Sequence, residues 1–278
     1  MNTLADGLIP ILGFGTYQIT GDQALETVKH ALRVGYRHID TAQAYNNEAE
    51  VGHAILSSGL PRAHVFVTTK VWPDNFRADD LPSSVNRSLQ KLGTDYIDLL
   101  LLHWPHPQIA LEETLQALMA VQRSGKTRYI GVSNFTIPLM EQAVNICGQG
   151  TLINNQVEYH PYLWQDRLIQ AAHQLDMSVT AYRPLAKAKI LQDSTINQIA
   201  QTHGKTPAQI TLRWIIQQGI ITIPRSSNRK HVSENFDVFD FSLSEADMQA
   251  IHRIPGKQRL VSPEELAPDW DSPEPVFA

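Results

Sequence analysis

The chain has 278 residues, 42% of them hydrophobic, and a formal net charge of −5 at pH 7, which is ordinary for a soluble globular protein built as two domains or as one α/β barrel. The acidic balance argues against nucleic acid or an anionic membrane as a partner, because either would call for clustered basic residues. The single cysteine, Cys147, excludes an intrachain disulfide, and since the sequence contains neither a membrane span nor a signal peptide we expect a cytoplasmic protein.

Short apolar runs alternate with stretches of helical spacing along the chain. In order, we predict a strand over 8–15, a helix over 22–34, a strand over 37–42, a helix over 48–56, a strand over 65–71, a helix over 81–92, a strand over 97–102, a helix over 111–123, a strand over 128–132, a helix over 138–146, a strand over 155–158, a helix over 166–175, a strand over 178–182, helices over 195–203 and 207–217, a strand over 220–223, and helices over 229–236 and 244–254. Asp22 is expected to cap the first helix, and Thr206 the helix that Pro207 begins.

The order of these elements favours one architecture. Eight strand–helix steps in succession predict an α/β fold of the closed (β/α)₈ barrel type rather than an open sheet. The sequence contains no linker, repeat or low-complexity segment, so we expect a single domain over residues 1–278. The proline-rich end, about 257–278, is predicted to be a loop that covers one end of the barrel.

One motif near the N-terminus points to a different fold and is set aside. Gly13-Phe14-Gly15 begins like the fingerprint of dinucleotide-binding Rossmann domains, and Asp40 follows at the end of the next predicted strand. The third glycine of the fingerprint is replaced by Gln18, whose side chain would keep a helix from packing closely on the first strand. We therefore do not predict a Rossmann domain, although a nicotinamide cofactor bound by other means stays possible.

Four residues that suit one active site come from separate parts of the chain. Asp40, Lys70 and His103 each lie at or near the end of a predicted strand, and Tyr45 follows Asp40 closely. Because the carboxyl ends of parallel barrel strands meet on one face, these side chains are expected to gather there. Each residue alone has a plainer interpretation, as a cap, a packing ring, a solvated amine or a core histidine. Their joint placement favours catalysis.

The chemistry of these four side chains suits the reduction of a carbonyl group, which needs a hydride donor and a proton donor. A free phenol has a pKa of about 10, and a nearby ammonium group is expected to lower it. We therefore expect Tyr45 to be the acid, Lys70 to tune it and Asp40 to hold Lys70. His103 would orient the carbonyl oxygen. No metal site is expected, since the prolines beside His103 and His106 prevent a regular helix and no third ligand follows.

Over almost its whole length, the chain resembles the aldo-keto reductase family. The resemblance rests on a series of segments in the family's order: GFGTYQ, GYRHIDTAQAYNNEAEVG, VFVTTKVW, SLQKLGTDYIDLLLLHWP, IGVSNF, NNQVEYHPY, AYRPLA, TPAQITLRW and IPRSSNRKHVSENF. It implies a (β/α)₈ barrel, NADPH as the hydride donor, and Tyr45 as general acid in a tetrad with Asp40, Lys70 and His103.

The resemblance also implies a set of binding residues. For the nicotinamide half of the cofactor these are Thr16, Tyr17, Asp40, Ser133, Asn134, Gln156 and Tyr182, and for the rest of it Arg183, Leu185, Arg225, Ser226, His231, Glu234 and Asn235. Arg225 and Ser226 are expected at the 2′-phosphate, which a guanidinium group grips well. The carbonyl pocket is implied to include Tyr17, Tyr45, Trp72, His103 and Trp104.

Several positions depart from the family's pattern. Arg225 stands where Lys is more frequent, and His231 where Arg is frequent. Arg183 replaces a small serine, and two interpretations remain open: it contacts the cofactor's pyrophosphate, or it turns outward. Lys187 and Lys189 are further candidates for phosphate contact. The short C-terminal segment implies a wide, polar mouth, which suits small or hydrophilic carbonyls such as methylglyoxal or keto-sugar acids.

Two other functions are alternatives to an NADPH-dependent reductase. One is a regulatory protein that binds nucleotide on the same barrel without useful turnover, which an intact tetrad argues against. The other is a barrel hydrolase, which needs a second carboxylate beside Asp40, and Glu158 is the candidate that the sequence offers. A monomer is expected.

Overall fold

The computed structural model describes residues 3–4 and 8–272. Its strands are β1 (Thr3–Leu4), β2 (Ile9–Pro10), β3 (Phe14–Gly15), β4 (His38–Asp40), β5 (Phe66–Val71), β6 (Ile97–Leu102), β7 (Thr127–Ser133), β8 (Leu152–Glu158), β9 (Ser178–Tyr182) and β10 (Ile221–Thr222). A two-stranded antiparallel sheet pairs β1 with β2, and β3 to β10 form an 8-stranded sheet in chain order with every pair parallel.

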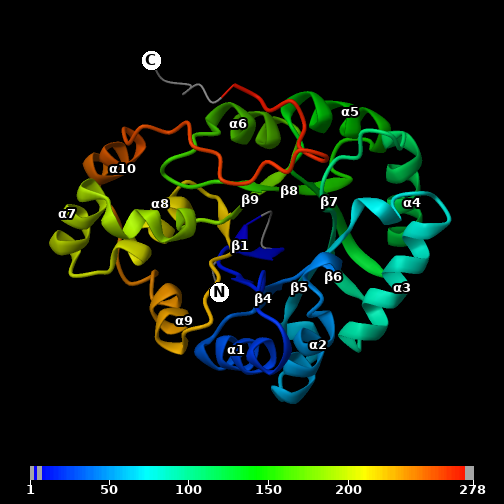
Figure 1. Cartoon of the computed structure of the whole chain (residues 1–278), viewed down its shortest axis with the longest axis horizontal. Coiled ribbons are helices and arrows are strands. Elements are labelled where there is room, and N and C mark those ends of the chain that lie inside the picture. The colour runs from blue at the N-terminus through cyan, green and yellow to red at the C-terminus, as the bar shows by residue number, and fades with distance from the viewer. Residues whose placement is uncertain (1–2, 5–7, 273–278) are drawn as a thin grey trace.

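Helices surround this sheet as an outer layer (Figure 1). They are α1 (Gly21–Val34), α2 (Glu48–Ser57), α3 (Asp80–Leu92), α4 (Leu111–Arg123), α5 (Ile137–Cys147), α6 (Asp166–Gln174), α7 (Ser194–His203), α8 (Pro207–Gln217), α9 (Arg229–Phe236) and α10 (Glu245–His252). Between β4 and α2, a 3-10 turn covers Gln43–Tyr45. No helix within 3–4 and 8–272 is long and apolar enough to cross a membrane.

The sheet closes on itself between its first and last strands. Leu12 pairs with Thr222 in a parallel bridge, and the amide of Gly13 donates to the Thr222 carbonyl at 2.9 Å. A little further on, the amide of Gly15 donates to the Pro224 carbonyl at 3.0 Å. A Cβ atom at Gly15 would come within 2.8 Å of the Ile223 carbonyl oxygen, so the closure needs glycine there. The predicted (β/α)₈ barrel is confirmed.

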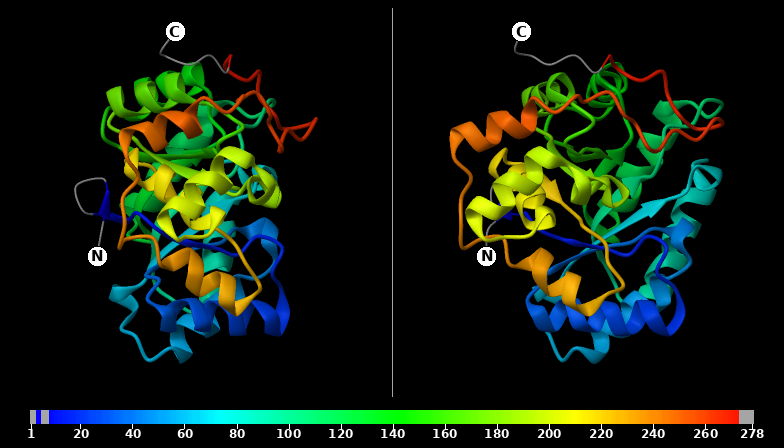
Figure 2. Two further views of the ribbon diagram at one scale, coloured as in Figure 1. Left: turned by 90° about the vertical axis from the view of Figure 1, so that its left-hand side faces the viewer. Right: turned by 60° about the vertical axis from the view of Figure 1, so that its left-hand side comes forward.

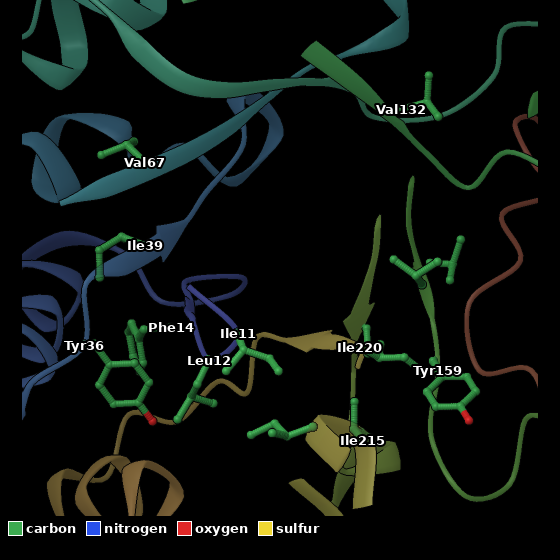
Figure 3. Close-up of a cluster of buried hydrophobic side chains, with 14 of the residues drawn as sticks. Ile11, Leu12, Phe14, Tyr36, Ile39, Val67, Val132, Tyr159, Ile215 and Ile220 are labelled. Atoms are coloured by element: carbon green, nitrogen blue, oxygen red, sulfur yellow. The ribbon is translucent and has the colours of Figure 1, made fainter. Parts of the chain in front are cut away.

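The alternation of side chains along the strands separates two apolar regions. In β6, Leu100 and Leu102 belong to the large cluster between the barrel and its helices, part of which is drawn in Figure 3. Leu99 and Leu101 belong instead to a small cluster with Ile9 and Ile221. Ile9 comes from the β1–β2 hairpin, which lies across one end of the barrel: it falls within the ring of strands in the view of Figure 1 and protrudes at the left of the left-hand view in Figure 2. The aliphatic character predicted for β6 therefore reflects burial on both faces.

Most predicted elements agree with the structure, and β6, β9, α4, α8 and α9 match to the residue. The single strand predicted over 8–15 is wrong: Ile9–Pro10 pairs with the N-terminal hairpin and Phe14–Gly15 joins the barrel. Asp22 is also wrong as a cap, because α1 begins one residue earlier and Thr20 is its N-cap. Thr206 caps α8 as predicted, with its side chain accepting from the Gln209 amide.

The C-terminal segment crosses the barrel on the side of α5 and α6, as both views in Figure 2 show. The amide of Gln258 donates to the Tyr162 carbonyl at 2.7 Å, and the Asp271 carboxylate accepts from the Ile137 amide at 2.9 Å. Val261 and Pro263 line the large cleft of the protein. The predicted loop over one end of the barrel is thus present as far as residue 272, and the remainder lies outside the described residues.

Candidate active site

The four predicted catalytic residues converge at the carboxyl end of the barrel. Asp40 is the last residue of β4, Lys70 is the last but one of β5, and His103 follows β6 directly. The Lys70 ammonium donates to Asp40 Oδ1 at 2.5 Å, to the Thr41 carbonyl at 2.8 Å and to the Tyr45 hydroxyl at 3.5 Å. Both members of this ion pair are buried. The Lys70 ammonium therefore links the Asp40 carboxylate to the Tyr45 phenol by hydrogen bonds.

Tyr45 is held at the edge of the cleft by aromatic neighbours. Its ring makes edge contacts with the rings of Tyr17, at 5.1 Å between centroids, and of His103, at 5.6 Å. The His103 ring in turn makes an edge contact with Trp72 at 5.3 Å. The phenol and the imidazole thus face the same space from β4 and β6.

The acidity of Tyr45 departs from expectation. Its pKa is raised well above the ordinary value, first by burial and then by the Asp40 carboxylate, while Arg183 opposes the rise. We had expected Lys70 to lower this pKa, and that prediction is wrong for the protein without cofactor. The physical reason is that burial penalises the charged phenolate, and the Asp40 carboxylate adds to this penalty. The resting phenol therefore keeps its proton, as a proton donor must.

His103 is neutral for a related reason. Burial, and then the charge of Lys70, hold its pKa well below the ordinary value. Its Nδ1 atom is buried and has no hydrogen-bond partner among the described residues. A neutral imidazole can donate one hydrogen bond without competing with Tyr45 as the acid.

The tetrad lies beside a cleft of about 1430 Å³, larger than a usual small-molecule site. Most of the predicted binding residues line it: Tyr17, Asp40, Tyr45, Trp72, His103, Trp104, Ser133, Asn134, Gln156, Tyr182, Arg183, Leu185, Arg225, Ser226, His231, Glu234 and Asn235. The lining of the cleft extends from the end of β4 to α9. One space therefore serves both sets of predicted residues.

The residues predicted for the nicotinamide end form a buried polar network. Gln156 donates to the free oxygen of Asp40 at 2.7 Å, which leaves both Asp40 oxygens occupied. Asn134 donates to the His103 carbonyl at 3.0 Å and accepts from the Tyr182 hydroxyl at 2.8 Å. The network links β4, β6, β8 and β9 and fixes the cleft's floor.

The residues predicted for the adenosine end come from the segment after β10 and from α9. The Arg225 side chain donates from Nε to the Tyr17 carbonyl at 2.9 Å and from one terminal nitrogen to the Gln18 carbonyl at 3.4 Å. Arg225 is exposed, so its remaining donors face outward into the cleft. Such a donor set fits a phosphate group.

The structure shows where the side chains lie whose roles the sequence left undecided. Arg183 faces the cleft, with its guanidinium 5.5 Å from the centre of the Tyr17 ring. Lys187 also lines the cleft, whereas Lys189 donates to Gln258 on the C-terminal segment at 2.9 Å. Thr16 is fully buried behind the cleft, and its hydroxyl donates to the Asp40 carbonyl at 2.9 Å. Thr16 therefore supports Asp40 and does not line the predicted cofactor space.

Sequence reasoning missed Gln43, which links the carbonyl pocket to α3. Its side-chain oxygen accepts from the Trp72 amide at 3.0 Å, and its side-chain nitrogen donates to the hydroxyls of Ser84 and Ser88. This fixes the segment that carries the Trp72 ring. The sequence around Gln43 does not indicate this role, because the bonding partners of Gln43 lie in distant segments.

Comparison with known proteins decides the family. The model of the Aldo/keto reductase family matches residues 11–255. The chain belongs to the aldo/keto reductase family. It is 45% identical over 265 residues to the methylglyoxal reductase DkgB of Escherichia coli O157:H7, covering 95% of this chain and 99% of that protein. It is also 40% identical over 256 residues to a 9,11-endoperoxide prostaglandin H2 reductase of Trypanosoma cruzi, covering 91% of this chain and 90% of that one.

A solved structure extends this likeness to three dimensions. The crystal structure of a provisionally named 2,5-diketo-D-gluconic acid reductase B superposes with a TM-score of 0.94 at 46% identity, covering 97% of each chain. This aldo/keto reductase is accordingly an oxidoreductase that reduces carbonyl compounds. Within the described residues, no three His, Cys, Asp or Glu side chains are grouped so as to hold a metal ion.

Proposed function

We propose that this aldo/keto reductase uses NADPH to reduce small, polar aldehydes and ketones, with Tyr45 as the general acid. The observation that carries the proposal is the position of Lys70, which bonds both the Asp40 carboxylate and the Tyr45 hydroxyl beside a cleft of about 1430 Å³. A bound dihydronicotinamide supplies the hydride. The residues of the chain hold the carbonyl group and move the proton.

Proton transfer follows from the charges around Tyr45. The phenol is protonated at rest because its pKa is raised. When it gives its proton to the carbonyl oxygen, a phenolate forms 3.5 Å from the Lys70 ammonium. A positive charge already in place where negative charge develops stabilises the transition state without reorganisation. Neutral His103, from the neighbouring strand, donates to the same oxygen and orients it.

The substrate class is proposed from the mouth of the cleft and from the relatives. Methylglyoxal is named in a curated relative, and a keto-sugar acid in the relative of known structure. The cleft wall includes polar groups of Asn75, Arg87 and Lys91 beside the aromatic rings, which suits hydrophilic carbonyls. We propose methylglyoxal and keto-sugar acids as substrates, and a monomeric, cytoplasmic enzyme.

Nicotinamide absorbance tests the reaction. The purified protein is mixed with NADPH and, separately, with methylglyoxal, an unbranched aldehyde and a keto-sugar acid, and the loss of the reduced band is followed. Turnover with at least one of these is expected. Binding of NADPH without turnover on any carbonyl would favour the regulatory nucleotide-binding protein instead. A hydrolase is disfavoured by the place of Glu158, which is buried outside the cleft lining.

The preference for NADPH over NADH is proposed to rest on Arg225. Replacing it by alanine removes a charged hydrogen bond to phosphate, and NADPH should bind about 10- to 100-fold more weakly while NADH changes little. Nucleotide quenching of tryptophan fluorescence measures both affinities. Arg229→Ala is the matched control, because Arg229 is an exposed cation on α9 that pairs with Glu26 and does not line the cleft. Equal losses for both nucleotides would remove Arg225 from the phosphate.

A further inference from the structure

Glu158, the last residue of β8, is a buried carboxylate that the proposed reaction does not use. Its Oε1 atom accepts from the Leu260 amide at 2.7 Å and from His160 Nε2 at 2.8 Å. Its Oε2 atom accepts from the Val261 amide at 2.8 Å. Both oxygens are therefore engaged, and two of the three donors are main-chain groups about a hundred positions further along the chain.

The residues held by this carboxylate form part of the cleft wall. Val261 and Pro263 line the cleft together with Trp104. Glu158 itself does not line it. The hydrogen bonds of the carboxylate reach the cleft through the main chain of the C-terminal segment, and its charge also raises the pKa of Tyr182, which lines the cleft, after the larger effect of burial. A side chain in this position cannot touch the carbonyl compound, but it can set the position of the wall that does.

Arg259 provides a second attachment of the same segment. Its guanidinium donates to the Gln165 side chain at 3.3 Å, and Gln165 donates to the Glu158 carbonyl at 2.7 Å. The guanidinium also lies 3.6 Å from the centre of the Trp270 ring, which contacts Trp104 edge-on at 6.2 Å. Both attachments therefore lead from β8 to the same aromatic edge of the cleft.

The chemistry of the site requires an acceptor with two free oxygens. Two amides that point at one side chain need two acceptor atoms, and an ionised carboxylate supplies both. Glutamine has the same shape but offers one oxygen and places an N–H group against the other amide. Both bonds are partly buried, and leaving an amide without a partner there is unfavourable, so the segment would have to shift.

We propose that Glu158 is a positioning residue that sets substrate selectivity: by fixing residues 260–263 it fixes the width of the carbonyl pocket. The inference rests on the proposed function. It concerns neither the proton donor nor the cofactor, because Tyr45 and Arg225 lie on other segments of the cleft. A looser segment should admit a bulkier carbonyl while hydride and proton transfer remain intact.

Glu158→Gln tests this with a pair of substrates that differ at one end. Methylglyoxal and phenylglyoxal share the reacting dicarbonyl, and phenyl replaces methyl. In the variant, the ratio of kcat/KM for methylglyoxal to that for phenylglyoxal should fall about tenfold, the size of effect that a small change in a pocket produces. The affinity for NADPH should stay within about twofold, because no side chain that lines the nucleotide part of the cleft is replaced and Tyr182, whose pKa Glu158 raises, keeps its ring and its bond to Asn134.

Hydrogen exchange supplies a readout that needs neither nucleotide nor carbonyl. The amides of Leu260 and Val261 should exchange at least about tenfold faster in Glu158→Gln, since each loses a hydrogen bond to a charged acceptor. Glu264→Gln is the control: it makes the same chemical change on the C-terminal segment, at an exposed side chain. Neither the selectivity ratio nor the exchange rates should change in it.

The outcomes separate the two proposals. A folded Glu158→Gln protein with unchanged selectivity or unchanged exchange overturns the positioning role and leaves the reductase activity standing. Equal losses for both dicarbonyls, together with a lower Tm, would reveal a purely structural role and also overturn it. If the variant does not fold, Arg259→Met decides, because it loosens the same segment and should shift the ratio in the same direction. Absence of any turnover in the unaltered enzyme counts against the proposed function, and exchange still tests the attachment.

Discussion

Two buried aspartates, at opposite ends of the barrel strands, use the same interaction for different purposes. Asp40, at the carboxyl end of β4, pairs with Lys70. Asp98, the second residue of β6, pairs with Arg62 at 2.8 Å and with Arg128 at 3.1 Å. Each carboxylate is almost wholly buried. By distance and burial alone the two clusters would be assigned the same role.

The surroundings of the cations tell them apart. Lys70 reaches a phenol that lines the cleft, so its charge acts on a group that can react. The two arginines beside Asp98 instead lie over the ring of Tyr96, at 4.3 and 4.1 Å from its centre. Asp98 also accepts from the Val67 amide at 3.0 Å. Every partner in the second cluster is structural, in keeping with the division between the two faces of such barrels.

A buried ion pair therefore does not by itself identify an active site. At both ends, the pair satisfies groups that burial would otherwise penalise. A catalytic role also requires that the cation contact a second group, here the Tyr45 phenol, which can lose its proton and which lines the cleft where a ligand binds. Removing the Tyr45 hydroxyl should therefore affect turnover, whereas removing the charge of Asp98 should affect stability.

The largest expected effect is on turnover. Tyr45→Phe removes the proton donor and should lower kcat about 10²- to 10⁴-fold, the usual contribution of a general acid. NADPH affinity should stay nearly intact, since the ring is kept. Steady-state rates and fluorescence quenching measure the two quantities. Tyr96→Phe is the matched control at the other cluster, because it removes a phenol oxygen and keeps the ring under both arginines. Turnover that survives in Tyr45→Phe would refute the assigned acid.

Next in size is an effect on stability without an effect on chemistry. Asp98→Asn leaves two arginines and a main-chain amide with one oxygen, and should lower the free energy of unfolding by about 3 kcal/mol. This is at the lower end for a broken buried pair, because Arg62 and Arg128 are partly solvated. Urea denaturation measures it, and kcat should be unchanged. Asp95→Asn, at an exposed aspartate just before β6, serves as the control. A selective loss of kcat would erase the distinction between the two ends.

The last expected effect appears only in acid, and it concerns a group whose pKa depends on both clusters. His38 is buried in β4, and burial lowers its pKa to about 4, with Asp40 and Asp98 raising it and Lys70 lowering it. Between pH 6.5 and 4 the unfolded chain binds a proton at His38 that the folded chain does not, so stability falls as the pH falls. The loss should be about 3 kcal/mol across that window.

His38→Gln should reduce this fall in the free energy of unfolding between pH 6.5 and 4, as measured by urea denaturation at several pH values. The exposed His64→Gln provides the control for the same substitution. If the free energy of unfolding falls as steeply with pH in the His38 variant as in the unaltered protein, other groups cause the pH dependence.

Sequence reasoning was most successful where one short segment contains the whole signal. An aliphatic run defined β6, and a Thr206 cap followed by Pro207 defined α8. It was less successful where a partner strand decides. Residues 8–15 are apolar throughout, and only pairing with β1 on one side and β4 on the other divides them into two strands. The predicted direction of the Tyr45 pKa shift was wrong for a similar reason, since it depends on how deeply the fold buries the phenol and on how close it brings Asp40.

The sequence by itself determined the order of strands and helices, the closure into a barrel, the family and the placing of Asp40, Lys70 and His103 at strand ends. The elements and the strand-end residues follow from periodicity and from local runs, and the family follows from the series of matching segments. Only the tertiary structure decided what Gln43, Asp98 and Glu158 do. Their partners lie in other strands or in the C-terminal segment, and such contacts are fixed by register and barrel closure. No local pattern encodes them, because the distance that matters lies across the barrel and not along the chain.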